Sequence, residues 1–268
     1  MSNKQSRSNR LDLQLNLNES TAIKSHRKME LLSSGTFLIE DIVEINGSGS
    51  RIFVMCNTWL IELFELEAGE FSFIKGKEYI RPSIKRFGIF YPPFAIMQIY
   101  VKDVKGHWTG MAATEPLPEK FMTIPMIFET DFKGTPKSVE QVKEILDSSY
   151  NRQSIEINPT PSLLSLKAKR LIDENYLIQP SIARIAARLD VTHAHLTRQF
   201  TRDFGLNPSA YCHQLRIADA TFRLASGEEI IDVSQEVGYN DLSRFYKQFS
   251  KATRKPPGYC QASKKRHL

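Results

Sequence analysis

The chain repeats one pattern near its C-terminal end: Thr192-His193-Ala194-His195-Leu196-Thr197-Arg198-Gln199-Phe200 and, 49 residues further on, Asp241-Leu242-Ser243-Arg244-Phe245-Tyr246-Lys247-Gln248-Phe249. The segments in front of these stretches, 185–189 and 233–237, also correspond, at an offset of 48 residues. One extra residue therefore lies in the second turn. A helical unit that occurs twice and is basic on its outward side indicates a protein that reads two neighbouring segments of a DNA groove.

Positive charge is concentrated in the C-terminal part of the 268-residue chain. Residues 162–268 contain 17 Lys and Arg against 10 Asp and Glu, a net charge of +7, whereas the remainder holds 19 and 20, a net charge of −1. This imbalance indicates a polyanionic partner for the C-terminal part, although a basic surface can also serve solubility alone. The length favours two domains.

The cysteines and the N-terminus indicate a cytoplasmic protein. Cys56, Cys212 and Cys260 form an odd set without paired spacing, which argues against disulfides or a zinc site and fits a reducing compartment. The polar residues 1–10 are followed by no apolar stretch suited to a signal peptide. No run approaches the roughly 20 apolar residues of a membrane helix, so we expect no membrane partner.

Apolar spacing and capping residues predict a helical C-terminal part. The predicted helices cover about 163–176, 182–189, 193–204, 208–226, 230–237 and 242–255. Ser181, Thr192, Asn207 and Asp241 are suitable N-caps. Gly205 and Gly227 are expected to end the helices that precede them. The prolines of Asn158-Pro159-Thr160-Pro161 cannot continue a helix, so a linker is expected before this part.

The N-terminal part has the pattern of an antiparallel barrel or sandwich. Candidate strands cover about 37–45, 51–55, 59–66, 71–80 and 94–101, with a hairpin turn at Lys75-Gly76-Lys77. Residues 1–30 are interpreted as a flexible arm, either without order or with one short ordered piece, and 115–135 as extended and irregular. An apolar ligand cavity or simple core packing would account for seven aromatic residues of this part: Trp59, Phe64, Phe71, Phe73, Phe90, Tyr91 and Phe94.

A helix is predicted over 136–150, with Pro136 in its first turn. Val139, Val142, Ile145 and Leu146 fall on one face of it. This apolar face either packs on its own domain or pairs with a second copy of the chain, so these four residues are the candidates for a dimer helix.

The C-terminal motifs resemble the AraC/XylS family of bacterial transcription regulators over roughly Leu163–Tyr259. The family's first unit ends in Leu, Ser or Thr, Arg, any residue and Phe, which Leu196–Phe200 matches, and a glycine follows at Gly205. Arg216–Ala220 resembles the Arg-Leu-x-x-Ala motif of the linking helix. Ile230–Tyr239 is similar to the motif Ile-x-x-Ile-Ala-x-x-Val-Gly-Phe of the second unit.

Four positions depart from the family pattern. Ser234 stands where the family usually has Ala, and Asp190 stands where a turn glycine is common. Arg254 replaces the glycine that normally ends the last helix, and Pro257-Gly258-Tyr259 is one residue shorter than the usual spacing from Pro to Tyr.

The resemblance implies an α+β chain. Residues 1–150 would form a β-rich, cupin-like barrel for effector binding or dimerisation, residues 151–161 a linker, and residues 162–268 an all-α DNA-binding domain with two helix-turn-helix units. The implied partners are double-stranded promoter DNA, RNA polymerase and a small-molecule effector whose identity and pocket are unknown from the sequence. A homodimer is a further expectation.

The second helix of each unit is expected to lie in a major groove and present its outward residues to base edges. The expected base-contacting residues are His193, Ala194, Thr197, Arg198, Ser243, Tyr246 and Lys247. The expected phosphate-contacting residues are Arg202, Arg244, Lys251, Arg254 and Lys255. Arg198 can bind guanine with two hydrogen bonds, whereas Lys247 lacks that planar fork, so we expect the first unit to carry more specificity. Leu242 is either outward-facing or part of the core.

Motifs for catalysis or cofactor binding are not apparent in the sequence. His26 and His107 are the only histidines before the linker and lack the clustered spacing of a metal-binding cupin, so neither a metal nor a cofactor is expected. We interpret the chain as a sequence-specific transcription regulator rather than an enzyme. The alternatives are a non-specific, nucleoid-type DNA-binding protein and a barrel enzyme with an appended helical domain.

Overall fold

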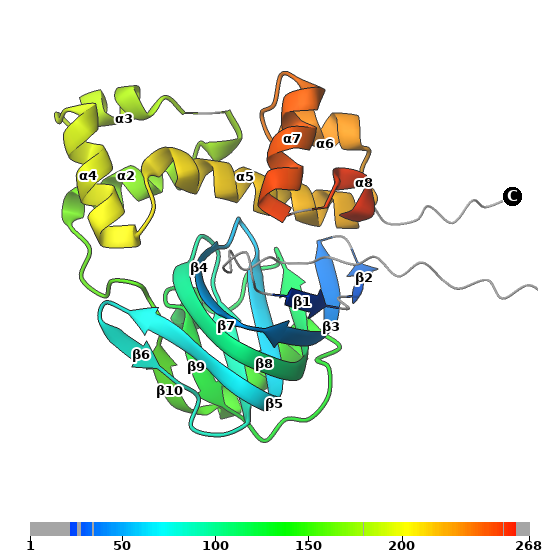
Figure 1. Ribbon diagram of the computed structural model, residues 1–268. Helices are drawn as coiled ribbons and strands as arrows, with labels where there is room; N and C mark the ends of the chain where they lie inside the picture. Colours follow the sequence, from blue (N-terminus) through cyan, green and yellow to red (C-terminus); the bar gives the residue numbers. More distant parts are fainter. Residues whose placement is uncertain (1–21, 26–27, 34, 179, 254, 261–268) are drawn as a thin grey trace, which may run out of the picture.

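The computed structural model describes the chain apart from residues 1–21, 26–27, 34, 179, 254 and 261–268. Figure 1 shows a curved β-sheet domain formed by the N-terminal part of the chain and, against one end of it, a helical domain formed by the C-terminal part. Most of the expected arm at 1–30 lies outside the described residues. Its last part is ordered, as the second interpretation allowed: residues 22–25 and 28–33 pair as strands with the first long strand of the sheet.

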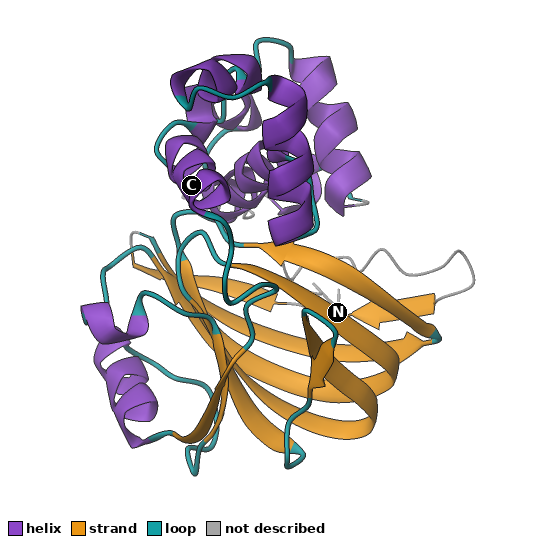
Figure 2. Cartoon of the chain, turned by 90° about the vertical axis from the view of Figure 1, so that its left-hand side faces the viewer, coloured by secondary structure: helices purple, strands orange, loops and turns teal. Residues whose placement is uncertain are grey.

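Antiparallel pairing joins all the described strands into one sheet. They are β1 (Ala22–Ser25), β2 (Lys28–Ser33), β3 (Thr36–Asn46), β4 (Ser48–Val54), β5 (Trp59–Lys75), β6 (Glu78–Ile80), β7 (Arg86–Tyr91), β8 (Ile96–Ala113), β9 (Met126–Glu129) and β10 (Tyr150–Ser154). Hydrogen bonds connect them in the order β1-β3-β8-β5-β7-β9-β10, with β2 on β3, β4 on β8 and β6 on β5. This path does not return from β10 to β1, so the expected barrel is a strongly curved but open sheet in the described part of the chain (Figure 2).

Two predicted strand ends are wrong. The strand predicted to end at residue 66 continues as β5, and the register against β8 shifts there between Leu66 and Glu70. Gly69 has a φ of 87°, and a Cβ there would lie 2.2 Å from the Asp103 carbonyl oxygen, so the backbones approach too closely for a side chain. β8 likewise continues past the predicted end at residue 101, because β3 and β5 flank it on both sides. The predicted turn at Gly76 is confirmed between β5 and β6.

The segment expected to be irregular, 115–135, contains two short elements. Glu119–Phe121 forms a 3-10 helix, and β9 pairs with β7 and β10. The sequence pattern did not predict β9, because three prolines lie in the segment 115–135. None of these prolines is among the four residues of the strand. Because β10 spans Tyr150–Ser154, the first four residues of the expected linker belong to the sheet.

The helix predicted at 136–150 is α1 (Val139–Ser148). Ser138 caps it by accepting a hydrogen bond from the Gln141 amide at 3.1 Å, so Pro136 precedes the cap instead of occupying the first turn. Three of its apolar residues, Val142, Ile145 and Leu146, are no more than 2% exposed and pack in the sheet domain with residues such as Trp59. This burial favours the packing alternative over a dimer contact, and Val139 is half-buried beside the same cluster.

The helical domain follows the predicted order. Its helices are α2 (Leu163–Asp173), α3 (Ile182–Arg188), α4 (His193–Phe204), α5 (Pro208–Ala225), α6 (Ile230–Glu236), α7 (Leu242–Thr253) and α8 (Pro257–Cys260), with a 3-10 turn at Tyr176–Ile178. The predicted caps are confirmed: the side chains of Ser181, Thr192, Asn207 and Asp241 each accept a hydrogen bond from the amide three residues ahead. Among the helices that the structure describes, none has the length and apolarity needed to cross a bilayer.

The sheet domain packs against both ends of the helical domain. The core that fills the sheet continues into the second unit, and the rings of Phe37 on β3 and Phe222 on α5 lie 5.6 Å apart. Val54 and Ile96 join a second cluster with α2, α3 and α4. Both helical units therefore pack on one sheet, which fixes their positions relative to each other.

Candidate nucleic-acid interface

The first helix-turn-helix unit consists of α3, a four-residue turn and α4. Asp190 in the turn has a φ of 56°, a left-handed conformation that Asp tolerates better than most residues. This explains how the chain manages without the glycine common at this position. Leu196 and Phe200 are fully buried against α2 and α3 and Phe204 is 7% exposed, so the opposite face of α4 points outward.

The second unit, α6 and α7, repeats the first. α3 and α6 have 7 residues each, and α4 and α7 have 12 each. The extra residue lies in the turn, where Gly238 has a φ of 81° and a Cβ would meet the Leu177 carbonyl oxygen at 2.1 Å. Ser234, which replaces an expected Ala, is buried and donates its hydroxyl to the Ile231 carbonyl at 2.7 Å, so the hydroxyl is satisfied.

A buried arginine braces this second turn. The Arg216 side chain on α5 is 4% exposed, donates to the Val237 carbonyl, and lies 4.1 Å over the ring of Tyr239. Burial lowers the pKa of Arg216, although its ordinary value is so high that the group stays charged. The Tyr239 hydroxyl is 3.0 Å from Nδ1 of His213, also on α5. Both contacts tie α5 to the α6–α7 turn.

The outward faces of α4 and α7 carry the residues expected to contact bases. On α4, His193, Ala194 and Arg198 are exposed and Thr197 is half-buried, and on α7, Ser243, Tyr246 and Lys247 are exposed. Leu242 is 39% exposed, so it belongs to this outward face and not to the core. The structure therefore gathers the two expected sets on two equivalent helix faces.

The residues expected to contact phosphates differ in their surroundings. Arg202 on α4 and Arg244 on α7 are exposed. Lys251 is exposed but lines a cavity between α7, α5 and β4. The Lys255 ammonium lies 4.8 Å over the ring of Tyr259, and Arg254 is outside the described residues.

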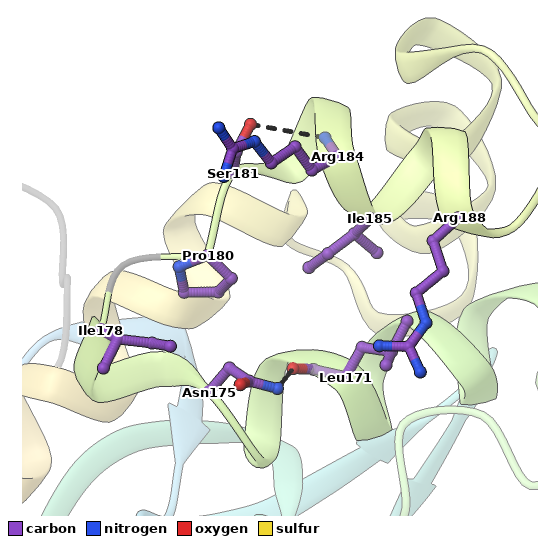
Figure 3. A pocket seen from close by; sticks show the side chains of 8 residues that line it. All are labelled: Leu171, Asn175, Ile178, Pro180, Ser181, Arg184, Ile185 and Arg188. Atoms are coloured by element: carbon purple, nitrogen blue, oxygen red, sulfur yellow. Dashed lines mark hydrogen bonds between the residues drawn. The ribbon is translucent and has the colours of Figure 1, made fainter.

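Two basic residues on α3 were not among those predicted from the sequence to contact DNA. Arg184 and Arg188 are exposed and flank a cavity of about 260 Å³ between α2, the Tyr176–Ile178 turn and α3 (Figure 3). Figure 3 also shows the bond from the Arg184 amide to Ser181 that starts α3. Basic residues four positions apart on the helix before a recognition helix suit phosphate contacts, and this spacing was the available signal.

Helix α5 separates the two units. Figure 1 shows α3 and α4 beside one end of α5 and α6 and α7 beside the other. Its 18 residues span about 27 Å at about 1.5 Å per residue. Recognition helices in successive major grooves are about 34 Å apart, so a spacer of this length brings the two units to a comparable separation.

The aromatic residues of the sheet domain form a packed core. The ring of Phe64 lies 4.6 to 5.1 Å from those of Trp108, Phe71 and Phe87. This favours core packing over an apolar ligand cavity for Trp59, Phe64, Phe71, Phe73, Phe90 and Tyr91, all buried, whereas Phe94 is half-buried at the domain boundary. His107 lies 3.5 Å from a Glu40 carboxylate, and His26 falls outside the described residues. Nowhere in the described part do three His, Cys, Asp or Glu side chains gather as metal ligands would.

Comparisons with known proteins agree with this geometry. A family model described as a helix-turn-helix domain matches residues 185–262. Over 81 residues the chain is 31% identical to the lactose operon transcription activator of Staphylococcus xylosus, a match that covers 30% of this chain and 29% of that protein.

The solved structures that resemble the chain are more distant. ToxT from Vibrio cholerae has 12% identity and a TM-score of 0.48, with 91% of this chain and all of ToxT covered. The C-terminal domain of the response regulator YesN from Fusobacterium nucleatum has 22% identity and a TM-score of 0.36, with 38% of this chain and all of that domain covered. The family model and the repeated geometry together show that the C-terminal part of the chain contains a helix-turn-helix domain, and its motifs resemble those of the AraC/XylS family.

Proposed function

We propose that the protein is a sequence-specific transcription regulator of the AraC/XylS type that binds double-stranded promoter DNA through both helix-turn-helix units. The carrying observation is the duplicated α3–α4 and α6–α7 geometry, with equal helix lengths and an outward polar face on each second helix. Arg198 would read guanine in one major groove, and Ser243 and Lys247 would contact bases in the next. Arg184, Arg188, Arg202 and Arg244 would position the protein on phosphates.

The sheet domain is the proposed sensor, and it lies where the resemblance implies a cupin-like barrel. A small-molecule effector or a second copy of the chain would act there and change how the two units are presented. The continuous core between the sheet and α5 supports this coupling. Because α1 buries its apolar face in its own domain, we assign no dimer surface to that helix.

The proposed setting is the cytoplasm, where promoter DNA and RNA polymerase are available. The curated relative is named as a transcription activator, so we propose activation through contact with RNA polymerase. All three cysteines are buried, which is compatible with this compartment.

Selection of bound sequences from random duplexes, followed by competition, tests this function. The full chain should hold its selected site about 10³-fold or more tightly than unrelated DNA at physiological salt. Equal competition by unrelated DNA would favour the nucleoid-type alternative. A protein that shows neither selection nor retention would contradict DNA recognition altogether.

A further inference from the structure

A cavity of about 520 Å³ lies where the sheet domain meets the second helix-turn-helix unit. Strand β4 and the neighbouring strand β8 form one wall, and α5, α7 and the loop between α4 and α5 form the rest. The residues that line it come from both domains. Its volume falls within the range of about 300–1,000 Å³ that is usual for small-molecule sites.

The lining of this cavity is basic and rich in hydrogen-bond donors. Arg51 and Lys251 face it from opposite domains, and none of the lining residues is acidic. Burial lowers the pKa of His213, and the positive charges of Arg216, Lys251 and Arg244 lower it further. These charges surround the His213 wall, so the electrostatic potential there favours an anion.

The remaining lining residues suit a small polar molecule and not a lipid chain. Side-chain amides come from Gln98, Gln214 and Gln248, and Gln98 bonds the Ser50 hydroxyl at 3.4 Å. Ile52, Leu206 and Ala252 supply only a short apolar surface. A compact carbon skeleton with several oxygens would satisfy both parts of the wall.

We propose that this cavity binds a small hydrophilic organic anion, bearing carboxylate or phosphate groups, between Arg51 of the sheet domain and Lys251 of α7. The anion bridges the two domains, because each supplies one of the two flexible cations. It thereby restrains α7, the recognition helix of the second unit, relative to the sheet. This inference rests on the proposed function only for its regulatory consequence, since anion binding itself needs no DNA.

Isothermal titration calorimetry of the full chain at constant ionic strength tests the site. The probes are citrate for carboxylates, glucose 6-phosphate for organic phosphates, inorganic phosphate, and glucose as the neutral control. At least one of the two organic anions should bind with one-to-one stoichiometry, and glucose should not bind. Arg51→Gln should weaken that binding about tenfold or more, because it removes a charge-assisted contact. Lys133→Gln removes an equal charge at an exposed position outside the cavity and should leave the affinity unchanged.

A second measurement on the unaltered chain keeps the test independent of variant folding. The imidazole nitrogen resonances of His213, assigned by comparison with His213→Gln, should shift as the anion is titrated. The proposal is overturned if neither organic anion binds, if Arg51→Gln binds like the unaltered chain, or if the His213 resonances stay fixed at saturation. Binding of the chain to its selected DNA site is measured separately, in the absence of anion. A chain that retains DNA but binds no anion refutes only this inference, and one that binds anion without selecting DNA refutes only the proposed function.

Discussion

At the scale of single residues, Arg216 shows how a buried charge can support a turn. Its guanidinium bonds the Val237 carbonyl and stacks on Tyr239, so it links the spacer helix to the second unit. We predict that Arg216→Met, which keeps much of the volume, lowers the free energy of unfolding by about 1–3 kcal/mol, because the Val237 carbonyl loses its charged donor. Urea denaturation measures this change. Arg170→Met on the exposed face of α2 is the control, and an equal effect in both variants would contradict the role of Arg216.

Arg198 is the residue with the sharpest prediction for recognition. It is exposed one turn into α4, where it can reach the edge of a base. Arg198→Ala should relax the preference at one base pair by about 1–3 kcal/mol and leave the other positions unchanged. Arg202→Ala, assigned to a phosphate, should weaken all sequences alike. Binding measured on a set of single-base variants of the site separates these outcomes, and an unchanged preference in Arg198→Ala would contradict the orientation of α4.

At the scale of elements, two glycines with similar backbones should respond differently to substitution. Gly76 has a φ of 63° and open space for 4 Å around the point where a Cβ would lie, whereas Gly238 has a φ of 81° with the Leu177 carbonyl oxygen 2.1 Å from that point. Gly76→Ala should cost about 1–2 kcal/mol from the backbone alone. Gly238→Ala should cost about 1–3 kcal/mol more, because the second turn must open. Thermal unfolding of both variants measures the difference, and equal losses would show that the contact with Leu177 does not constrain the turn.

The start of α2 is tied to α4 by a buried carboxylate. Asp203 accepts from the Ser162 hydroxyl at 2.7 Å, the Ser162 amide at 3.0 Å and the Gln199 side chain at 3.1 Å. Burial opposes ionisation of Asp203, but hydrogen bonds from Ser162, Ser165 and Gln199 outweigh it and lower its pKa. The charged form therefore stabilises the junction between the linker and the first unit.

We predict that Asp203→Asn lowers the free energy of unfolding at pH 7 by about 1.5–3 kcal/mol, through the loss of charged hydrogen bonds. A lowered folded-state pKa stabilises the fold above the unfolded-state value, and this contribution disappears as the pH falls through the folded-state pKa. The difference between the unaltered chain and the variant should thus be complete at pH 7 and shrink below the ordinary value of 3.8. Asp190→Asn, at an exposed left-handed position that Asn also tolerates, should change little. A pH-independent difference would contradict the ionised state of Asp203.

Local chemistry made the helical domain predictable from sequence. Ser181, Thr192, Asn207 and Asp241 each specify a helix start through a bond three residues away, so neighbouring residues suffice to place it. The outward faces of α4 and α7 were predicted from the helical spacing of their apolar residues. The length of β5 and β8 was not predictable, because the strands that flank them come from distant parts of the chain. The cavity beside Arg51 and Lys251 was hidden for the same reason, since about 200 residues separate its two cations.

At the scale of the whole molecule, one sheet packs against two helix-turn-helix units, which lie at the two ends of α5. The first unit packs on Val54 and Ile96, and the second shares the core that contains Phe37. Both units therefore contact the same sheet, which holds α4 and α7 in one relative placement. Such a rigid arrangement favours DNA sites in which two short boxes have a fixed separation.

The most direct test of this account is selection of binding sites from random duplexes, carried out with the unaltered chain, Arg198→Ala and Lys247→Ala. We predict two conserved boxes whose centres are about 10 base pairs apart, because two recognition helices on one face of DNA meet successive major grooves. Arg198→Ala should lose information in one box only, and Lys247→Ala in the other only. A single box, or loss from the same box in both variants, would contradict the claim that the duplicated units read neighbouring grooves.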